Sequence, residues 1–83
     1  MSNSLMISHL RQILHGESLL RRHKIDVDVE GNSSIKKIVL AGRVSLYYQK
    51  QVAQSLVKRY IDAHRMNGLA AATVTIENNL RVD

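Results

Sequence analysis

Four histidines are the residues of this chain best suited to metal chemistry, but their spacing does not favour a metal site. Histidines that share a metal on one helix commonly lie four residues apart, and no pair here has that or another recognised ligand spacing. Cysteine is absent, which excludes thiolate ligands, thiolate nucleophiles and disulfides. We therefore expect no metal and no cofactor. The histidines are His9, His15, His23 and His64.

Three carboxylates, Asp26, Asp28 and Glu30, alternate along one short segment. Carboxylates held close together can raise one another's pKa by like-charge repulsion, as in a general acid–base pair. The simpler interpretation is a charged outer face of a sheet, which pairs with basic residues of neighbouring strands and opposes edge pairing. Neither a Ser–His motif nor a Gly-rich phosphate loop accompanies these carboxylates. The sequence therefore predicts a protein that is not an enzyme.

Basic residues outnumber acidic ones, and the formal net charge is +5. Such an excess favours an anionic partner, namely nucleic acid, an acidic lipid surface or an acidic protein, although a merely solvated surface gives the same composition. Most of the excess falls outside the predicted strands, where it could form a basic rim. The residues of this predicted rim are Arg21, Arg22, Lys24, Lys50, Lys58, Arg59 and Arg65.

Two adjacent tyrosines, Tyr47 and Tyr48, start the longest predicted helix, so we expect at least one of them to be exposed. An exposed tyrosine can lie among lipid headgroups or anchor a protein contact. The predicted outer sheet face has no aromatic residue and the chain has no Gly-x-x-Gly loop, which argues against two common modes of RNA recognition. Phosphate contacts by the basic rim would bind nucleic acid without reading its sequence.

Hydrophobic periodicity predicts a first helix over about Leu5–Leu14, with Leu5 and His9 on its apolar stripe. His9 could therefore be a partly buried core histidine, whereas Arg11 and His15 fall on the polar side. A strand over Ile25–Glu30 and a second strand over Lys36–Val44 should form a hairpin. Within the second strand, Gly42 should mark a bulge or a close approach, and we expect a helix to pack over it. The residues expected at the ends of the first helix are Ser2, Asn3 or Ser4 as the N-cap and Gly16 at the C′ position.

A second helix is predicted over Tyr47–His64 and should end at Asn67-Gly68. Its apolar stripe is expected to comprise Val52, Ala53, Leu56, Val57, Tyr60 and Ile61. The last strand is predicted over Thr73–Val82, with a bulge at Asn78 because this residue interrupts the apolar face. The order αββαβ predicts an α+β fold in which a three-stranded mixed sheet carries both helices on one face. We expect one domain over residues 1–83, with its core over about 5–82.

Three segments resemble the BON domain, a small domain of bacterial envelope and osmotic-shock proteins. Ile38–Val44 is similar to the family's strand hydrophobic-x-Leu-x-Gly-x-Val, and Lys50–Tyr60 resembles the helix that follows it. Val74–Val82 is similar to its closing pattern Val-x-x-Val-x-Asn-x-Leu-x-Val. The resemblance implies a non-enzymatic module that contacts phospholipid surfaces or partner proteins, and it transfers no binding residue.

We therefore expect a non-catalytic, BON-like module that docks on an anionic phospholipid surface or a partner protein. The alternative is a nonspecific nucleic-acid-binding domain that uses the basic rim. No stretch is apolar enough to span a membrane, and the segment Met1–Leu14 is too polar for a signal-peptide core. As written, the chain is expected to be cytoplasmic, with peripheral membrane or envelope association left open, and to be a monomer or a weak homo-oligomer.

Overall fold

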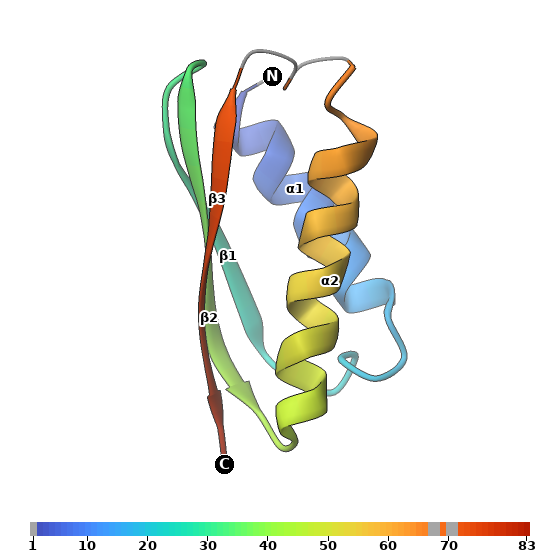
Figure 1. Ribbon diagram of the computed structural model, residues 1–83. Helices are drawn as coiled ribbons and strands as arrows, with labels where there is room; N and C mark the ends of the chain where they lie inside the picture. The colour runs from blue at the N-terminus through green and yellow to red at the C-terminus, as the bar shows by residue number, and fades with distance from the viewer. Residues whose placement is uncertain (1, 67–68, 70–71) are drawn as a thin grey trace.

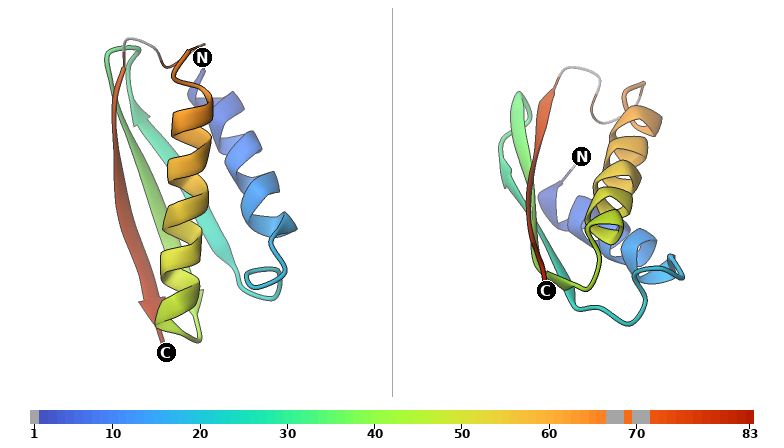
Figure 2. Two further views of the ribbon diagram at one scale, coloured as in Figure 1. Left: turned by 45° about the vertical axis from the view of Figure 1, so that its right-hand side comes forward. Right: turned by 60° about the horizontal axis from the view of Figure 1, so that its bottom comes forward.

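The computed structural model describes residues 2–66, 69 and 72–83. Two helices cover one side of a three-stranded sheet and leave the other side bare (Figures 1 and 2), which confirms the predicted α+β fold. The predicted helix stop at Asn67-Gly68 lies outside the described residues. The elements in chain order are α1 (Asn3–Gly16), β1 (Ile25–Gly31), β2 (Ile35–Val44), α2 (Tyr47–Ala63) and β3 (Thr73–Val82).

The sheet has the strand order β1-β2-β3, and β2 is its central strand. β1 runs antiparallel to β2 and β3 runs parallel to it, so the sheet is mixed as predicted. The register between β2 and β3 is continuous over the whole length of both strands, from Ile35 opposite Thr73 to Val44 opposite Val82. The parallel pairing follows from the crossover through α2, which returns the chain to the end at which β2 began.

The predicted bulge at Asn78 is wrong, because this side chain is accommodated in a regular strand. Asn78 Nδ2 donates to the carbonyl oxygen of Lys50 at 3.0 Å and to Gln54 Oε1 at 3.2 Å. A polar residue on the face that contacts α2 therefore finds acceptors on that helix. Burial of the amide does not require the strand to kink, because its hydrogen bonds are made.

The core lies between the helices and the inner face of the sheet, and every element contributes to it. Leu5 was expected on the buried stripe of α1 but is exposed. The buried stripe runs through Met6, and because each helix position is turned by about 100° from the one before it, Leu5 points away from the core. His9 is partly buried, as the sequence predicted. The largest fully buried side chains are Met6, Leu10, Leu14, Leu20, Ile38, Leu40, Leu69, Leu80, Val44 and Val57.

Gly42 is a position of close backbone approach, as the sequence predicted. Its φ angle is +124°, a conformation that residues with a Cβ rarely adopt. A Cβ atom built at this position would lie 2.2 Å from the carbonyl oxygen of Lys24. The close neighbour is therefore the chain that enters β1, which is paired with β2 at Ile25 opposite Gly42.

The ends of α1 differ partly from the prediction. Ser2 is the N-cap and its hydroxyl accepts from the amide of Leu5 at 3.1 Å, as one of the three candidates was expected to do. Gly16, predicted at C′, is instead the last helical residue, and it does not have a positive φ angle. The helix ends at Glu17, whose extended conformation turns the chain away from the helix axis.

Lys36 is buried on the inner face of β2 with only 3% of its surface exposed, a position that the sequence did not single out. Its ammonium group donates to Asn3 Oδ1, and Asn3 Nδ2 donates to the carbonyl oxygen of Gly31 at 3.1 Å. This chain of contacts ties the start of α1 to the β1–β2 hairpin. A buried ammonium group needs such a partner because leaving it unpaired would be costly.

Candidate functional site

One end of the molecule gathers exposed apolar side chains where the sequence leaves β2 and enters α2. Leu46, Tyr47 and Tyr48 are exposed by 59%, 64% and 60% of their surfaces. Leu19, in the segment between α1 and β1, is 43% exposed and lines a groove together with Tyr48. We call these four residues the tip. Figure 1 shows that both segments lie at the end of the molecule opposite the β1–β2 hairpin.

Gln49 joins the two segments that make the tip. Its Oε1 accepts from the amides of Ser45 and Leu46 at 2.9 and 3.0 Å. Its Nε2 donates to the carbonyl oxygen of Leu19 at 3.1 Å. Gln49 is the N3 residue of α2, and by accepting from the amide of Leu46 at the N-cap it supplies the N3 half of a capping box, while Leu46 has no side-chain acceptor for the other half. The tip is therefore held in one arrangement before anything binds to it.

Two grooves run from the tip along α2. The larger, with a volume of about 530 Å³, lies between α2 and the segment after α1, and it contains Tyr48 near Arg59. The smaller, of about 340 Å³, contains Tyr47 near Lys58. Each exposed tyrosine of the tip thus shares a groove with one basic residue of the predicted rim. Gln51 and Ser55 line both grooves and separate them.

The predicted basic residues do not form one continuous rim. Arg21, Arg22 and Lys24 are exposed and lie in the segment between α1 and β1, at the tip end of the molecule. Lys50 is half-buried in the first turn of α2. Arg65 is exposed but follows the C-terminal end of α2, which Figure 1 places at the end of the molecule opposite the tip.

A second basic surface lies beside α1, and its residues Arg11 and His15 were not among the predicted site residues. Arg11, His15 and Lys24 line a depression of about 400 Å³ together with Ile25 and Asp26. Periodicity had already placed Arg11 and His15 on the polar side of the first helix. What the sequence could not show is that the chain entering β1 brings Lys24 beside them, since that depends on how the segment after α1 returns to the sheet.

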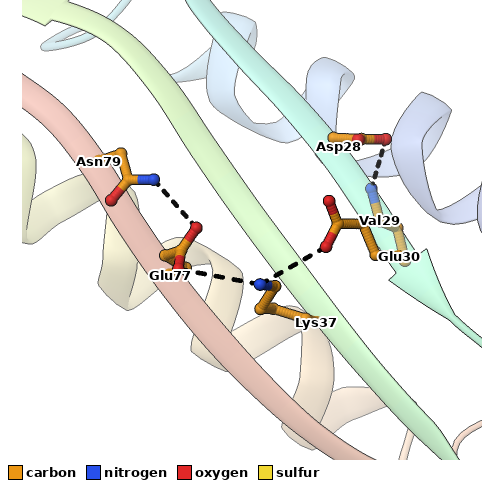
Figure 3. A network of polar contacts seen from close by, with 6 residues as sticks. All are labelled: Asp28, Val29, Glu30, Lys37, Glu77 and Asn79. Atoms are coloured by element: carbon orange, nitrogen blue, oxygen red, sulfur yellow. Dashed lines mark hydrogen bonds and ion pairs between the residues drawn. The ribbon is translucent and has the colours of Figure 1, made fainter.

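The bare face of the sheet is charged but internally paired (Figure 3). Lys37 Nζ lies 3.5 Å from Glu30 Oε2 and 3.8 Å from Glu77 Oε1, so one lysine joins all three strands. Asn79 Nδ2 donates to Glu77 Oε2 at 3.0 Å. These groups are partly exposed, and such pairs contribute little net stability. The face carries no aromatic side chain that could stack on a nucleic-acid base.

Two of the histidines, His9 and His64, lie at the contact between the two helices. His9 Nδ1 and the Tyr60 hydroxyl oxygen lie 2.9 Å apart, and His64 Nδ1 lies 2.9 Å from the carbonyl oxygen of Tyr60. The rings of Tyr60 and His64 have centroids 4.2 Å apart. Burial raises the pKa of Tyr60 above its ordinary value of 10.0. Over residues 2–66, 69 and 72–83, no group of three or more His, Cys, Asp or Glu residues could hold a metal ion.

Neither described helix is long and apolar enough to cross a membrane. No protein-family model, curated protein or solved structure matches the chain.

Proposed function

We propose that the chain is a non-catalytic, BON-like module that docks on anionic phospholipid surfaces through the tip. The observation that carries the proposal is the run Leu46, Tyr47 and Tyr48, three large side chains that are each more than half exposed at one end of the fold. Aromatic side chains with a polar group favour the boundary between lipid headgroups and acyl chains. The hydrogen bonds of Gln49 fix the tip, so little order would have to be gained on docking.

The charges near the tip support an anionic surface rather than a neutral one. Arg21, Arg22 and Lys24 lie at the tip end, and each basic residue close to an anionic bilayer contributes about 1 kcal/mol. Three such residues together with a shallowly inserted apolar tip would give reversible binding that weakens as salt is added. The far end of the molecule offers Arg65 but takes no part in this contact.

Co-sedimentation with vesicles tests the proposal. We expect the chain to pellet with vesicles of phosphatidylglycerol and phosphatidylcholine at low salt, to pellet less at high salt, and to stay in solution with phosphatidylcholine alone. The double variant Tyr47→Ala, Tyr48→Ala should lose most of this binding. Ile35→Ala is the matched control because Ile35 is 64% exposed at the opposite end of the molecule. Equal binding to both vesicle types, or no loss in the tip variant, would contradict the proposal.

A second candidate function, nonspecific binding of single-stranded nucleic acid, is favoured by the two grooves. A base could stack on Tyr48 or Tyr47 while Arg59 or Lys58 contacts the neighbouring phosphate. Fluorescence polarisation with labelled single-stranded DNA and RNA distinguishes the two functions. Lys58→Ala, Arg59→Ala should abolish nucleic-acid binding and leave vesicle binding largely intact. Absence of binding to either nucleic acid at low salt would end this candidate.

A further inference from the structure

The outer edge of β3 is an interaction surface that the docking function does not use. β3 is ten residues long, and β2 is the strand bonded to it in the described part of the chain. It contains no proline, and its register with β2 has no bulge. Proline and β-bulges are two features by which other proteins protect a sheet edge from pairing. Because β3 has neither, its edge remains open to pairing with another strand.

The free hydrogen-bonding groups of this edge belong to the even-numbered residues. The amide of Thr73 donates to Ser34 at 2.8 Å and the amide of Asp83 donates to Val44 at 3.0 Å. Since alternate residues of a strand turn their backbone groups to the same neighbour, the odd-numbered residues bond to β2 and the even-numbered ones face outward. Leu80 agrees with this assignment, because its amide donates to Asn78 Oδ1 at 3.2 Å rather than to β2. Pairing with another strand would exchange this local contact for a backbone carbonyl of that strand.

We infer that the edge of β3 pairs antiparallel with β3 of a second copy of this chain, about a twofold axis at Asn79. In this register, Glu77 of each copy lies opposite Arg81 of the other. The odd-numbered positions then form non-hydrogen-bonded pairs, in which opposed side chains approach most closely. The product is a continuous six-stranded sheet with two Glu–Arg contacts and all four helices on one face.

Charge distinguishes β3 from the other edge of the sheet. In β3, self-pairing places the acidic Glu77 of each copy opposite the basic Arg81 of the other. Glu77 is already oriented by its contacts with Lys37 and Asn79 (Figure 3). In β1, by contrast, the exposed side chains Asp26 and Asp28 are carboxylates, and self-pairing would place like charges opposite one another. The structure therefore favours self-association through β3.

Sedimentation equilibrium of charge variants tests the pairing. The wild-type chain should show a reversible monomer–dimer equilibrium. Glu77→Arg and Arg81→Glu should each raise the dimer dissociation constant by about tenfold or more, since two like-charge contacts replace two opposite-charge ones. The double variant Glu77→Arg, Arg81→Glu should restore dimerisation. Asp28→Arg on the opposite edge is the control and should dimerise like the wild type.

Thermal melting of each variant shows whether the monomer still folds. Arg81→Glu is the more informative single variant, because it leaves the contacts of Lys37 with Glu30 and Glu77 in place. A wild-type chain that is monomeric at every concentration would overturn the inference. A folded double variant that does not recover dimerisation would overturn it as well.

Cross-linking tests the register directly, because the chain has no cysteine of its own. The two Cα atoms at Asn79 would lie about 4.5 Å apart across the axis, within reach of a disulfide. The two copies of Thr75 would lie about 26 Å apart, since eight residues separate their levels along the strands. Asn79→Cys should therefore form disulfide dimers under mild oxidation and Thr75→Cys should not. Equal rates for the two variants would contradict the pairing.

Discussion

Tyr60 places its hydroxyl in the contact between the two helices, 2.9 Å from His9 Nδ1. Its pKa is raised by burial, so at high pH the unfolded chain releases the phenolic proton before the folded chain does. Because the pKa of Tyr60 is higher in the folded state, its contribution to stability does not change with pH below the unfolded-state pKa of 10.0. The free energy of unfolding then falls as the pH rises from that value through the folded-state pKa. Tyr60 should therefore contribute to the loss of stability at alkaline pH.

The variant Tyr60→Phe tests this dependence. At neutral pH we expect it to be less stable than the wild type by about 1 kcal/mol, because a buried hydrogen-bonding contact is lost. Between about pH 9 and about pH 11, the wild type should lose more stability than the variant, as measured by urea denaturation. Tyr47→Phe changes an exposed tyrosine and should keep the wild-type pH dependence. Equal alkaline losses in wild type and Tyr60→Phe would contradict the assignment.

Sequence reasoning at the residue scale failed where a residue's role depends on a distant segment. Gly42 was recognised as a position of close approach, but the sequence did not show that the approaching group is the backbone of Lys24. Lys36 reads as an ordinary strand lysine, and only the contact with Asn3 explains its burial. Such roles are decided by contacts between elements, which local periodicity does not contain.

At the scale of elements, hydrophobic periodicity predicted which side of a strand or helix is buried. β1 alternates buried and exposed residues because one side faces the helices, and the same alternation is present in its sequence. The buried residues of α2, namely Ala53, Val57, Tyr60 and Ile61, all belong to its predicted apolar stripe. Helix ends were less predictable, since the conformation of Gly16 depends on where the following segment must go.

The connection between the two tip segments yields a prediction at the same scale. Gln49→Ala removes acceptors from the amides of Ser45 and Leu46 and a donor from the carbonyl of Leu19. We expect a loss of about 1 kcal/mol in the free energy of unfolding, because these groups can turn to water. Hydrogen exchange of the Ser45 and Leu46 amides should accelerate.

Vesicle binding should also weaken in Gln49→Ala although no charge and no tip side chain has changed, because the tip must then become ordered on docking. Gln12→Ala is the matched control, since Gln12 is an exposed glutamine on α1 and lines neither groove of the tip. A vesicle affinity equal to that of the wild type would show that the tip docks without being held in place.

At the scale of the whole molecule, the sequence predicted the architecture but not the grouping of its surface. The order of elements and their single apolar faces leave few ways to bury both helices, and the structure has the expected one. The predicted rim, by contrast, combined residues from both ends of α2. Lys50 and Arg65 lie fifteen positions apart, which corresponds to roughly 22 Å along a helix. Basic residues that the sequence grouped into one rim are therefore not all close together in space.

The shape of the molecule predicts how it stands on a membrane. Its principal extents are 36 × 19 × 18 Å, and Figure 1 places the tip and the β1–β2 hairpin at opposite ends. Docking through the tip should therefore bring one end into the headgroups and hold the other in water. Ser45→Cys beside the tip and Ser33→Cys in the hairpin give matched sites for an environment-sensitive dye, since both serines are exposed.

With anionic vesicles, the dye at position 45 should shift to shorter wavelength while the dye at position 33 stays unchanged. The measurement belongs at protein concentrations where the chain sediments as a monomer, because pairing about Asn79 would place the hairpin of a second copy beside the tip of the first. For the same reason, dimerisation should compete with docking, so apparent affinity for vesicles should fall as protein concentration rises. Equal shifts of both dyes would indicate that the molecule lies flat, with α1 and its Arg11 surface against the lipid instead of the tip.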